Sequence, residues 1–370
     1  MRGLAPLIIL TILCMGCGQR PAVNHIDQKM YVGTYTQKMG HVDGKGEGIY
    51  YLEATASRGW EIKQLAATLE NPSFVKTTRD GNFLYAVSEL GPGSAESGFV
   101  HSFRIQDDGA LKEIGKLPTG NFAPCHIAID PQQEFVFVAN YAGSPVNVYK
   151  RLSDGTLEHF QLLEIPVPQG SHPHSVVVSE DGKTLYIADL GNDRIWIFIR
   201  EDFEFVLHPD QGAGLEQGSG PRHLSLSRDG RHLYSANELD SSVSVFQVQP
   251  DGGLHETQKL STLPESFKET NYPADIHLHP SLPFLYLSNR GHNSIAIYRI
   301  EGEGKLKWIG FSPTEGLTPR NFTITPGGDQ LLVANQDSDD IVLFSIDPQT
   351  GLLREQSQVQ VPSPVSLELY

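Results

Sequence analysis

Short β-rich segments recur along nearly the whole chain. Each unit opens with a proline, continues through a β-rich segment and a turn, and then enters an aromatic and aliphatic segment that ends in a polar pair. Successive units are 52, 49, 48, 52, 46 and 45 residues apart, which is the length of a four-stranded propeller blade. The opening prolines are Pro72, Pro124, Pro173, Pro221, Pro273, Pro319 and Pro364.

The second segment of each unit follows a tight turn. Asp-Gly pairs, which favour two-residue hairpin turns, begin at Asp80, Asp181 and Asp229. Third segments such as 146–149, 243–246 and 295–298 complete the pattern, so we expect antiparallel blades and no long helices. The second segments are residues 84–89, 136–141, 185–190, 233–238, 285–290 and 331–336.

The seventh unit lacks its later strands. Pro364–Tyr370 reads as a first strand, but no further strands follow it in the sequence. Met30–Thr36 and Gly48–Leu52 read as a second and third strand that lack a first. Joining these segments closes the ring and removes exposed sheet edges. The sequence therefore predicts an all-β fold, a seven-bladed β-propeller over residues 29–370 with one blade closed by N- and C-terminal strands.

Composition and charge exclude several classes of function. The formal net charge of −16 argues against nucleic-acid binding, which depends on clustered basic residues. Of the three cysteines, Cys14 and Cys17 lie in an apolar N-terminal run, which leaves Cys125 for the folded body and excludes a disulfide framework. No Cys and His spacing is typical of a zinc site. We expect no metal, no cofactor and a monomer.

The first 17 residues read as a signal peptide. Arg2 precedes an apolar stretch, Leu4 to Met15, that is too short to span a bilayer. The end of this segment resembles the bacterial lipobox, with Gly16 before a lipidated Cys17, although Cys14 stands at the usual Leu position. Residues 18–28 then form a tether. We expect an exported periplasmic or cell-envelope lipoprotein, held to the membrane only by its lipid; the alternative is an ordinary secretory signal.

Polar residues collect at equivalent positions of neighbouring units. The first strands of a propeller line its central channel, so the residues after each proline should surround one shared pocket. The acidic chain nevertheless places Arg, His and Glu at these positions, which indicates a functional cluster. After the prolines come Cys125, His126, His174, Arg222, His223, Asp275, Arg320 and Asn321, and at second-strand ends come Glu89, Asp189, Glu238 and Arg290. A recurring Asn or Asp at the second-strand ends is expected to bond local backbone instead, namely Asn140, Asp189, Asn237, Asn289 and Asn335.

At these residues the chain resembles the propeller-type lactonase family, which includes a bacterial 6-phosphogluconolactonase and, more distantly, a fungal carboxymuconate-lactonizing enzyme. The resemblance covers nearly all of the chain after Met30. It implies that His174, Glu238 and Arg290 are the functional residues; Ser171 stands where many members have proline. The motifs that carry it are 31–36, 71–74, 172–176, 220–223, 237–239, 274–277, 289–290 and 318–320.

The resemblance implies hydrolysis of a sugar lactone of the 6-phosphogluconolactonase type. This reaction needs a base to activate water, donors for the oxyanion and a proton for the departing ring oxygen. Glu238 could be the base, and Arg290 with His174 could stabilise the oxyanion, or a protonated His174 could serve the leaving oxygen. Arg222 and Arg320 could grip an anionic substrate group. His223, His126 and Asp275 are further candidates for substrate binding.

Two other functions fit the same residues. The cluster could catalyse the reverse type of chemistry, a muconate cycloisomerisation. The chain could also be a noncatalytic envelope propeller that binds a ligand or a protein, because a fold does not decide function. A nucleophilic serine elbow is absent from the sequence, which disfavours an acyl-enzyme. Export conflicts with 6-phosphogluconolactone as substrate, since that compound is a cytosolic intermediate.

Overall fold

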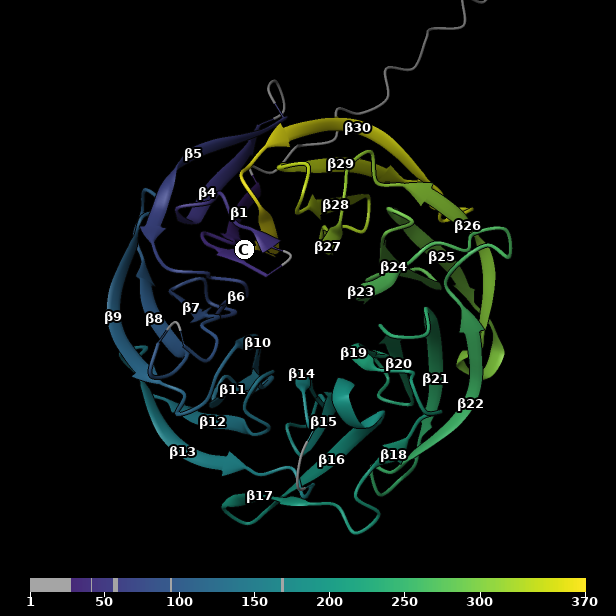
Figure 1. Cartoon of the computed structure of the whole chain (residues 1–370), viewed down its shortest axis with the longest axis horizontal. Coiled ribbons are helices and arrows are strands. Elements are labelled where there is room, and N and C mark those ends of the chain that lie inside the picture. Colours follow the sequence, from purple (N-terminus) through teal and green to yellow (C-terminus); the bar gives the residue numbers. More distant parts are fainter. Residues whose placement is uncertain (1–27, 41, 56–58, 94, 168–169) are drawn as a thin grey trace, which may run out of the picture.

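The computed structural model describes residues 28–370, except residues 41, 56–58, 94 and 168–169. The predicted signal peptide and almost all of the tether lie outside the described residues. The described part is a ring of seven sheets around a central channel, as Figure 1 shows. The seven-bladed β-propeller predicted from the repeat is therefore confirmed.

Six blades are built from consecutive strands, with the first strand nearest the channel and the fourth at the rim (Figure 1). Three of them comprise β6 (Val75–Thr77), β7 (Phe83–Ser88), β8 (Phe99–Ile105), β9 (Leu111–Pro118); β10 (Pro124–Ile129), β11 (Phe135–Asn140), β12 (Val146–Arg151), β13 (Leu157–Leu163); and β14 (Pro173–Val178), β15 (Thr184–Asp189), β16 (Arg194–Glu201), β17 (Glu204–Leu207). The other three comprise β19 (Pro221–Leu226), β20 (His232–Asn237), β21 (Ser242–Val248), β22 (Leu254–Ser261); β23 (Tyr272–Leu278), β24 (Phe284–Arg290), β25 (Ser294–Ile300), β26 (Leu306–Pro313); and β27 (Pro319–Ile324), β28 (Gln330–Asn335), β29 (Asp340–Ile346), β30 (Leu353–Gln360).

The seventh blade joins the two ends of the chain. Its strand order is β31 (Pro364–Leu369), β1 (Gln28–Thr34), β4 (Gly48–Thr55) and β5 (Gly59–Thr68). The antiparallel pairing sets Met30 opposite Leu369 and Gly33 opposite Ser366. The predicted composite blade is confirmed.

Five small elements and one boundary differ from the sequence pattern. β2 (Lys38–Met39) and β3 (Val42–Asp43) form a hairpin in the connection from β1 to β4. β18 (Ala213–Gly214) adds to β16, and η1 (Leu190–Asn192) and η2 (Gly302–Gly304) are single turns of helix. These short insertions leave no trace in the repeat. The pattern predicts that the first strand of this blade begins at Pro72. In the structure this strand, β6, begins three residues later, at Val75.

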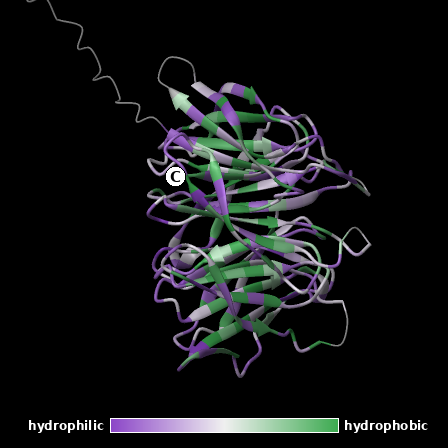
Figure 2. Ribbon diagram, turned by 90° about the vertical axis from the view of Figure 1, so that its left-hand side faces the viewer, coloured by the Kyte–Doolittle hydropathy of each residue, from purple (hydrophilic) through white to green (hydrophobic). Residues whose placement is uncertain are grey.

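Hydrophobic side chains hold neighbouring blades face to face. One cluster contains Phe137 of β11 and Val148 of β12 together with Ile187 of β15 and Trp196 of β16, so it spans two blades. Burial of such side chains contributes about 1.5 to 3 kcal/mol each. Figure 2 shows the strands edge-on, with hydrophobic segments inside the disc and many hydrophilic loops at its faces. The core is thus a ring of inter-blade clusters around the polar channel.

In five blades a tyrosine of the second strand makes a hydrogen bond to the next blade. The hydroxyl group of Tyr85 donates to the carbonyl of Gly155, in the outer hairpin of the following blade, at 3.0 Å. Gly155 has a φ of +90°, and a Cβ there would lie 2.1 Å from the ring of Phe83, so only glycine fits. Equivalent bonds join Tyr31 to Gly109, Tyr186 to Gly252, Tyr234 to Gly304 and Tyr286 to Gly351.

We predict that Tyr186→Phe lowers the free energy of unfolding by about 1 to 2 kcal/mol, because the buried Gly252 carbonyl loses its partner. Urea denaturation measures the change. Tyr149→Phe is the matched control, since the buried Tyr149 hydroxyl has no hydrogen-bond partner among the described residues. Equal stabilities for the two variants would contradict a role for the inter-blade bond.

Candidate active site

A β-bulge near the opening proline interrupts five of the first strands. In β10, β14, β19 and β27 the strand register shifts just after the opening proline, and in β23 it shifts between Pro273 and Ile276. A bulged residue is left out of the ladder, which frees it to point away from the sheet. The residues at these bulges include Cys125, His174, Arg222 and Arg320. Local backbone geometry therefore explains why the residue that follows the opening proline lines the cavity in these four blades.

These side chains surround a cavity of about 230 Å³ at one end of the channel. All seven blades contribute to its wall. The wall contains three arginines and two glutamates, so its formal charge is positive in an acidic protein. The lining residues are Tyr35, Met39, Val42, Glu89, Cys125, Tyr141, His174, Arg222, Glu238, Arg290 and Arg320.

Glu238 forms the centre of the charged cluster. Its Oε2 lies 2.7 Å from Nη2 of Arg290, which donates a hydrogen bond, and 2.8 Å from Nε of Arg222 in an ion pair without hydrogen-bond geometry. Burial opposes ionisation of Glu238, but the charges of Arg290 and Arg222 outweigh it and lower its pKa below 4.5. The carboxylate is therefore ionised at neutral pH.

The two guanidinium groups are held by backbone carbonyls as well. Arg222 donates through Nη1 to the carbonyl oxygen of Ala274 at 2.6 Å, and Arg290 donates through Nε to that of Tyr272 at 3.1 Å. Burial lowers the pKa of Arg290 to about 10, although Glu238 opposes the shift, so the group stays cationic at neutral pH. Both cations are thus fixed on one carboxylate before any ligand binds.

Arg320 belongs to a second polar group on the same wall. Its Nη2 donates to the hydroxyl of Tyr35 at 2.7 Å, and that hydroxyl donates to Oε2 of Glu89 at 3.0 Å. The guanidinium carbon also lies 5.1 Å from the centre of the Tyr35 ring. Tyr35 is almost completely buried.

His174 is a neutral member of the cavity wall. Burial first, and then the charge of Arg222, hold its pKa well below 6.5. Its Nδ1 lies 3.9 Å from Sγ of Cys125, and its ring lies edge-on to Tyr141, with 5.7 Å between centroids. A neutral imidazole does not fit the protonated role that the sequence left open for His174, whereas it can still donate one hydrogen bond.

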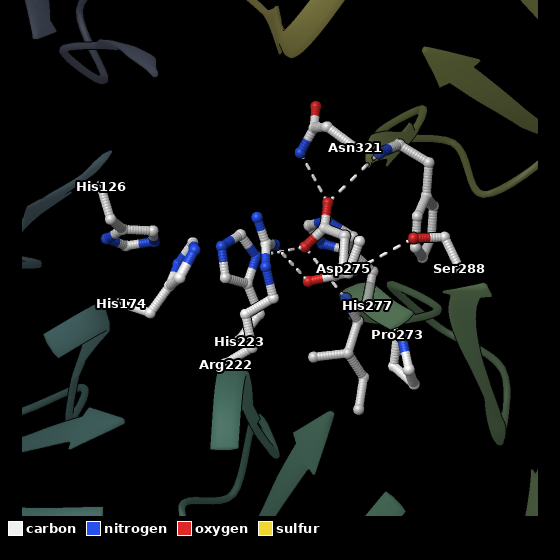
Figure 3. Close-up of polar contacts among 12 residues, drawn as sticks. His126, His174, Arg222, His223, Pro273, Asp275, His277, Ser288 and Asn321 are labelled. Carbon is white, nitrogen blue, oxygen red and sulfur yellow. Dashed lines mark hydrogen bonds and ion pairs between the residues drawn. The ribbon is translucent and has the colours of Figure 1, made fainter. Parts of the chain in front are cut away.

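The other three candidates for substrate binding, His126, His223 and Asp275, do not line the cavity. Figure 3 shows them together with His174 and Arg222, two residues of the cavity wall. Asp275 is buried and accepts hydrogen bonds from Nδ1 of His223 at 2.8 Å, from Nε2 of His277 at 3.0 Å and from Nδ2 of Asn321 at 2.6 Å. His126 packs edge-on against His223, with 5.4 Å between ring centroids. These contacts tie β10, β19, β23 and β27 together in the channel.

Burial and the charge of Arg222 lower the pKa of His223 to about 4. The pKa of Asp275 lies well below its usual range, because its bonds to His277 and His223 outweigh burial. Asp275 is thus an anion that is satisfied by protein donors, including a histidine, His277, that the sequence did not single out.

Of the recurring Asn and Asp of the second-strand ends, Asn140 and Asp189 make the predicted bonds to local backbone. Asp189 accepts from the backbone of His172 and from the indole of Trp196, and Asn140 donates to the carbonyl of Pro145. Asn237 donates to the hydroxyl of Ser242 instead, and Asn289 and Asn335 donate to the carbonyls of Thr262 and Thr314, 27 and 21 residues away. All three are fully buried.

Sequence reasoning missed Tyr35, Tyr141 and the β2–β3 hairpin. Met39 and Val42 of that hairpin form an apolar part of the cavity wall. Tyr35 and Tyr141 directly follow the second strands of their blades, the position that Glu89 and Glu238 occupy in others. Aligning the composite blade with the internal ones gives the signal that finds Tyr35.

Neither a metal cluster nor a membrane-spanning helix is found in the parts of the chain that the structure describes. No group of three or more His, Cys, Asp or Glu side chains among those residues is placed to hold a metal ion. No helix within the same residues is long and apolar enough to cross a bilayer.

Comparisons with known proteins agree with the repeat. Residues 29–369 match the family model described as lactonase, 7-bladed beta-propeller. The 6-phosphogluconolactonase of Bacillus subtilis strain 168 is 30% identical, over 91% of this chain and 97% of the relative. That of Formosa agariphila is 34% identical, over 92% and 99%.

Among solved structures, the periplasmic gluconolactonase PpgL of Pseudomonas aeruginosa matches with a TM-score of 0.84 and 30% identity, over 93% of this chain and 99% of the neighbour. The likeness covers every blade of the ring, including the composite one. The chain therefore belongs to the family of seven-bladed β-propeller lactonases.

Proposed function

We propose that this protein hydrolyses a sugar 1,5-lactone of the 6-phosphogluconolactone type, with Glu238 as the base that activates water. The observation that carries the proposal is the partly buried carboxylate of Glu238 between Arg222 and Arg290, in a cavity of about 230 Å³. The family membership and the names of the relatives support the same class of reaction.

The charges of Glu238, Arg222 and Arg290 suit the attack of water on the lactone. Glu238 takes a proton from a water molecule while the water oxygen attacks the lactone carbonyl, so negative charge leaves the carboxylate and develops on the substrate oxyanion. Arg290 and Arg222 already face the carboxylate, so their guanidinium groups can stabilise the negative charge on the oxyanion with little reorganisation. The lowered pKa of Glu238 makes it a weaker base but keeps it ionised. Neutral His174 can donate a further hydrogen bond to the oxyanion.

An anionic substituent fits the positive wall. A neighbouring hollow of about 710 Å³ shares Glu238, Arg290 and Arg320 with the cavity and adds Thr270 and Thr318. Guanidinium groups bind phosphate or carboxylate with paired hydrogen bonds. We place the phosphate of the substrate against Arg320 in this hollow.

Glu238→Gln should lower turnover by at least about a hundredfold, because the amide cannot accept the proton. Hydrolysis is followed against a panel of phosphorylated, plain and uronic lactones, and the spontaneous rate is subtracted. Since Gln leaves the buried guanidinium of Arg222 and the partly buried one of Arg290 without their counter-ion, thermal melting and binding of the product acid verify that the cavity persists.

A Glu238→Gln enzyme with the wild-type rate would remove Glu238 as the base. A wild-type protein that hydrolyses none of the lactones, but binds them, would favour the noncatalytic propeller. Both assays use purified protein that comprises residues 18–370.

Arg320→Ala should raise the Michaelis constant for a phosphorylated lactone much more than that for its uncharged counterpart. A lost charge-assisted pair is worth roughly 1.5 to 3 kcal/mol, or about ten- to more than a hundredfold. The substitution also removes the hydrogen bond between Arg320 and Tyr35. Because this loss affects both substrates, it cancels when the two Michaelis constants are compared. Equal losses on both would mean that Arg320 acts on the lactone itself or holds the channel together, and a wild type that prefers the uncharged lactone would reject the phosphate assignment.

We also propose that residues 1–17 direct export and that a lipid on Cys17 anchors the protein. The periplasmic location in the name of the Pseudomonas neighbour supports export. Cys17→Ser should release the protein from membranes on cell fractionation, because one lipid-modified residue is the only attachment in the proposal. Continued membrane association of the variant would point to an uncleaved signal segment.

A further inference from the structure

Lactone opening needs a proton for the departing ring oxygen, and neutral His174 does not supply one. We propose that Tyr35 is the general acid that donates this proton, with Glu89 and Arg320 as the residues that position it. The assignment rests on the hydrolysis proposed above and adds a catalytic residue to it.

The hydroxyl of Tyr35 is held from two sides. Arg320 donates to its oxygen at 2.7 Å, and the hydroxyl donates its own proton toward Glu89 at 3.0 Å. Tyr35, Glu89 and Arg320 all line the cavity that contains Glu238. Hydrolysis of a lactone needs a base for the attacking water and an acid for the leaving ring oxygen. Glu238 and Tyr35 on one cavity wall can provide both.

Arg320 is suited to stabilise the tyrosinate that proton donation leaves behind. Its guanidinium lies within hydrogen-bond distance of the phenolic oxygen and 5.1 Å from the ring centre. Burial raises the pKa of Tyr35 above its usual 10, although Arg320 opposes the shift. The proton therefore stays on the hydroxyl until a stronger base appears, and a departing alkoxide is such a base.

Other proton carriers on the wall are less well placed. The Cys125 thiol is buried, which raises its pKa, and its sulfur contacts mainly backbone carbonyls. The hydroxyl of Tyr141 makes no hydrogen bond to a guanidinium among the described residues. Tyr35 is the wall tyrosine that carries both a cation and a carboxylate on its hydroxyl.

The step balances. Glu238 first removes a proton from water, and the new C–O bond forms as the carbonyl electron pair moves to oxygen. The oxyanion then re-forms the carbonyl as the ring C–O bond breaks, the electron pair of that bond stays on the ring oxygen, and this oxygen takes the proton of Tyr35. The product is a hydroxy acid. Transfer of the proton held by Glu238 to the tyrosinate restores both residues.

The test compares leaving groups of different basicity in Tyr35→Phe. An aldono-1,5-lactone expels an alkoxide and needs the acid, whereas the phenyl ester of the same aldonic acid expels a phenolate, with a conjugate acid of pKa about 10. Tyr35→Phe should lower turnover of the lactone by at least about a hundredfold and that of the ester by less than about fivefold. Glu238→Gln should lower both.

A second readout uses the lactone alone. A fluorinated tyrosine at position 35 keeps an acidic proton and should restore most of the turnover that Phe loses. Tyr149→Phe is the control, because its hydroxyl is buried outside the cavity and has no partner among the described residues. It should retain wild-type turnover.

Equal losses on lactone and ester in Tyr35→Phe, or no rescue by the fluorinated residue, would overturn the acid role. Tyr35 would then only shape the cavity. Absence of lactone hydrolysis in the wild type would instead overturn the proposed function, so the two failures are distinguishable.

Discussion

Ring closure by β31 and β1 is the constraint on which the rest of the molecule depends. The C-terminal strand supplies the inner edge of a blade whose other strands come from the N-terminal part of the described chain. Closure brings Tyr35 against Arg320, although 285 residues separate them in sequence. Without that pairing, the cavity would lack the wall formed by Tyr35 and the β2–β3 hairpin.

The site is an electrostatic exception within an acidic protein. Burying Arg222, Arg290 and Arg320 together is costly, because each loses hydration and repels the others. Glu238 and Glu89 offset that cost at fixed positions. In the proposed hydrolysis, the same arrangement prepares the cavity for a substrate that gains negative charge during the reaction. Stability and chemistry therefore rest on the same carboxylate, and removing Glu238 affects both.

The repeat predicted the blades well because its information is local. A proline, a turn and an alternating strand recur with nearly constant spacing, so each first strand except β6 begins within a residue of its predicted start. The β2–β3 hairpin escaped prediction since it is a two-strand insertion in a single blade.

For the site, comparing the repeated units with one another identified which positions face the channel. It did not show how deep in the channel each side chain lies. The structure places Glu238, His174, Arg290, Arg222 and Arg320 on the cavity wall. His126, His223 and Asp275 lie on the first strands β10, β19 and β23, but their side chains pair with one another. Which of two consecutive residues enters the cavity is set by the bulge, and a bulge depends on backbone register that the sequence does not state.

The central claim is that Glu238 activates water and does not attack the lactone itself. A single turnover in water labelled with heavy oxygen, with enzyme in excess, tests it most directly. Direct attack by water predicts one labelled oxygen in the carboxylate of the first-turnover product and no label in Glu238. An unlabelled product, with heavy oxygen found in the Glu238 carboxylate by peptide mass spectrometry, would show a covalent anhydride and contradict the account.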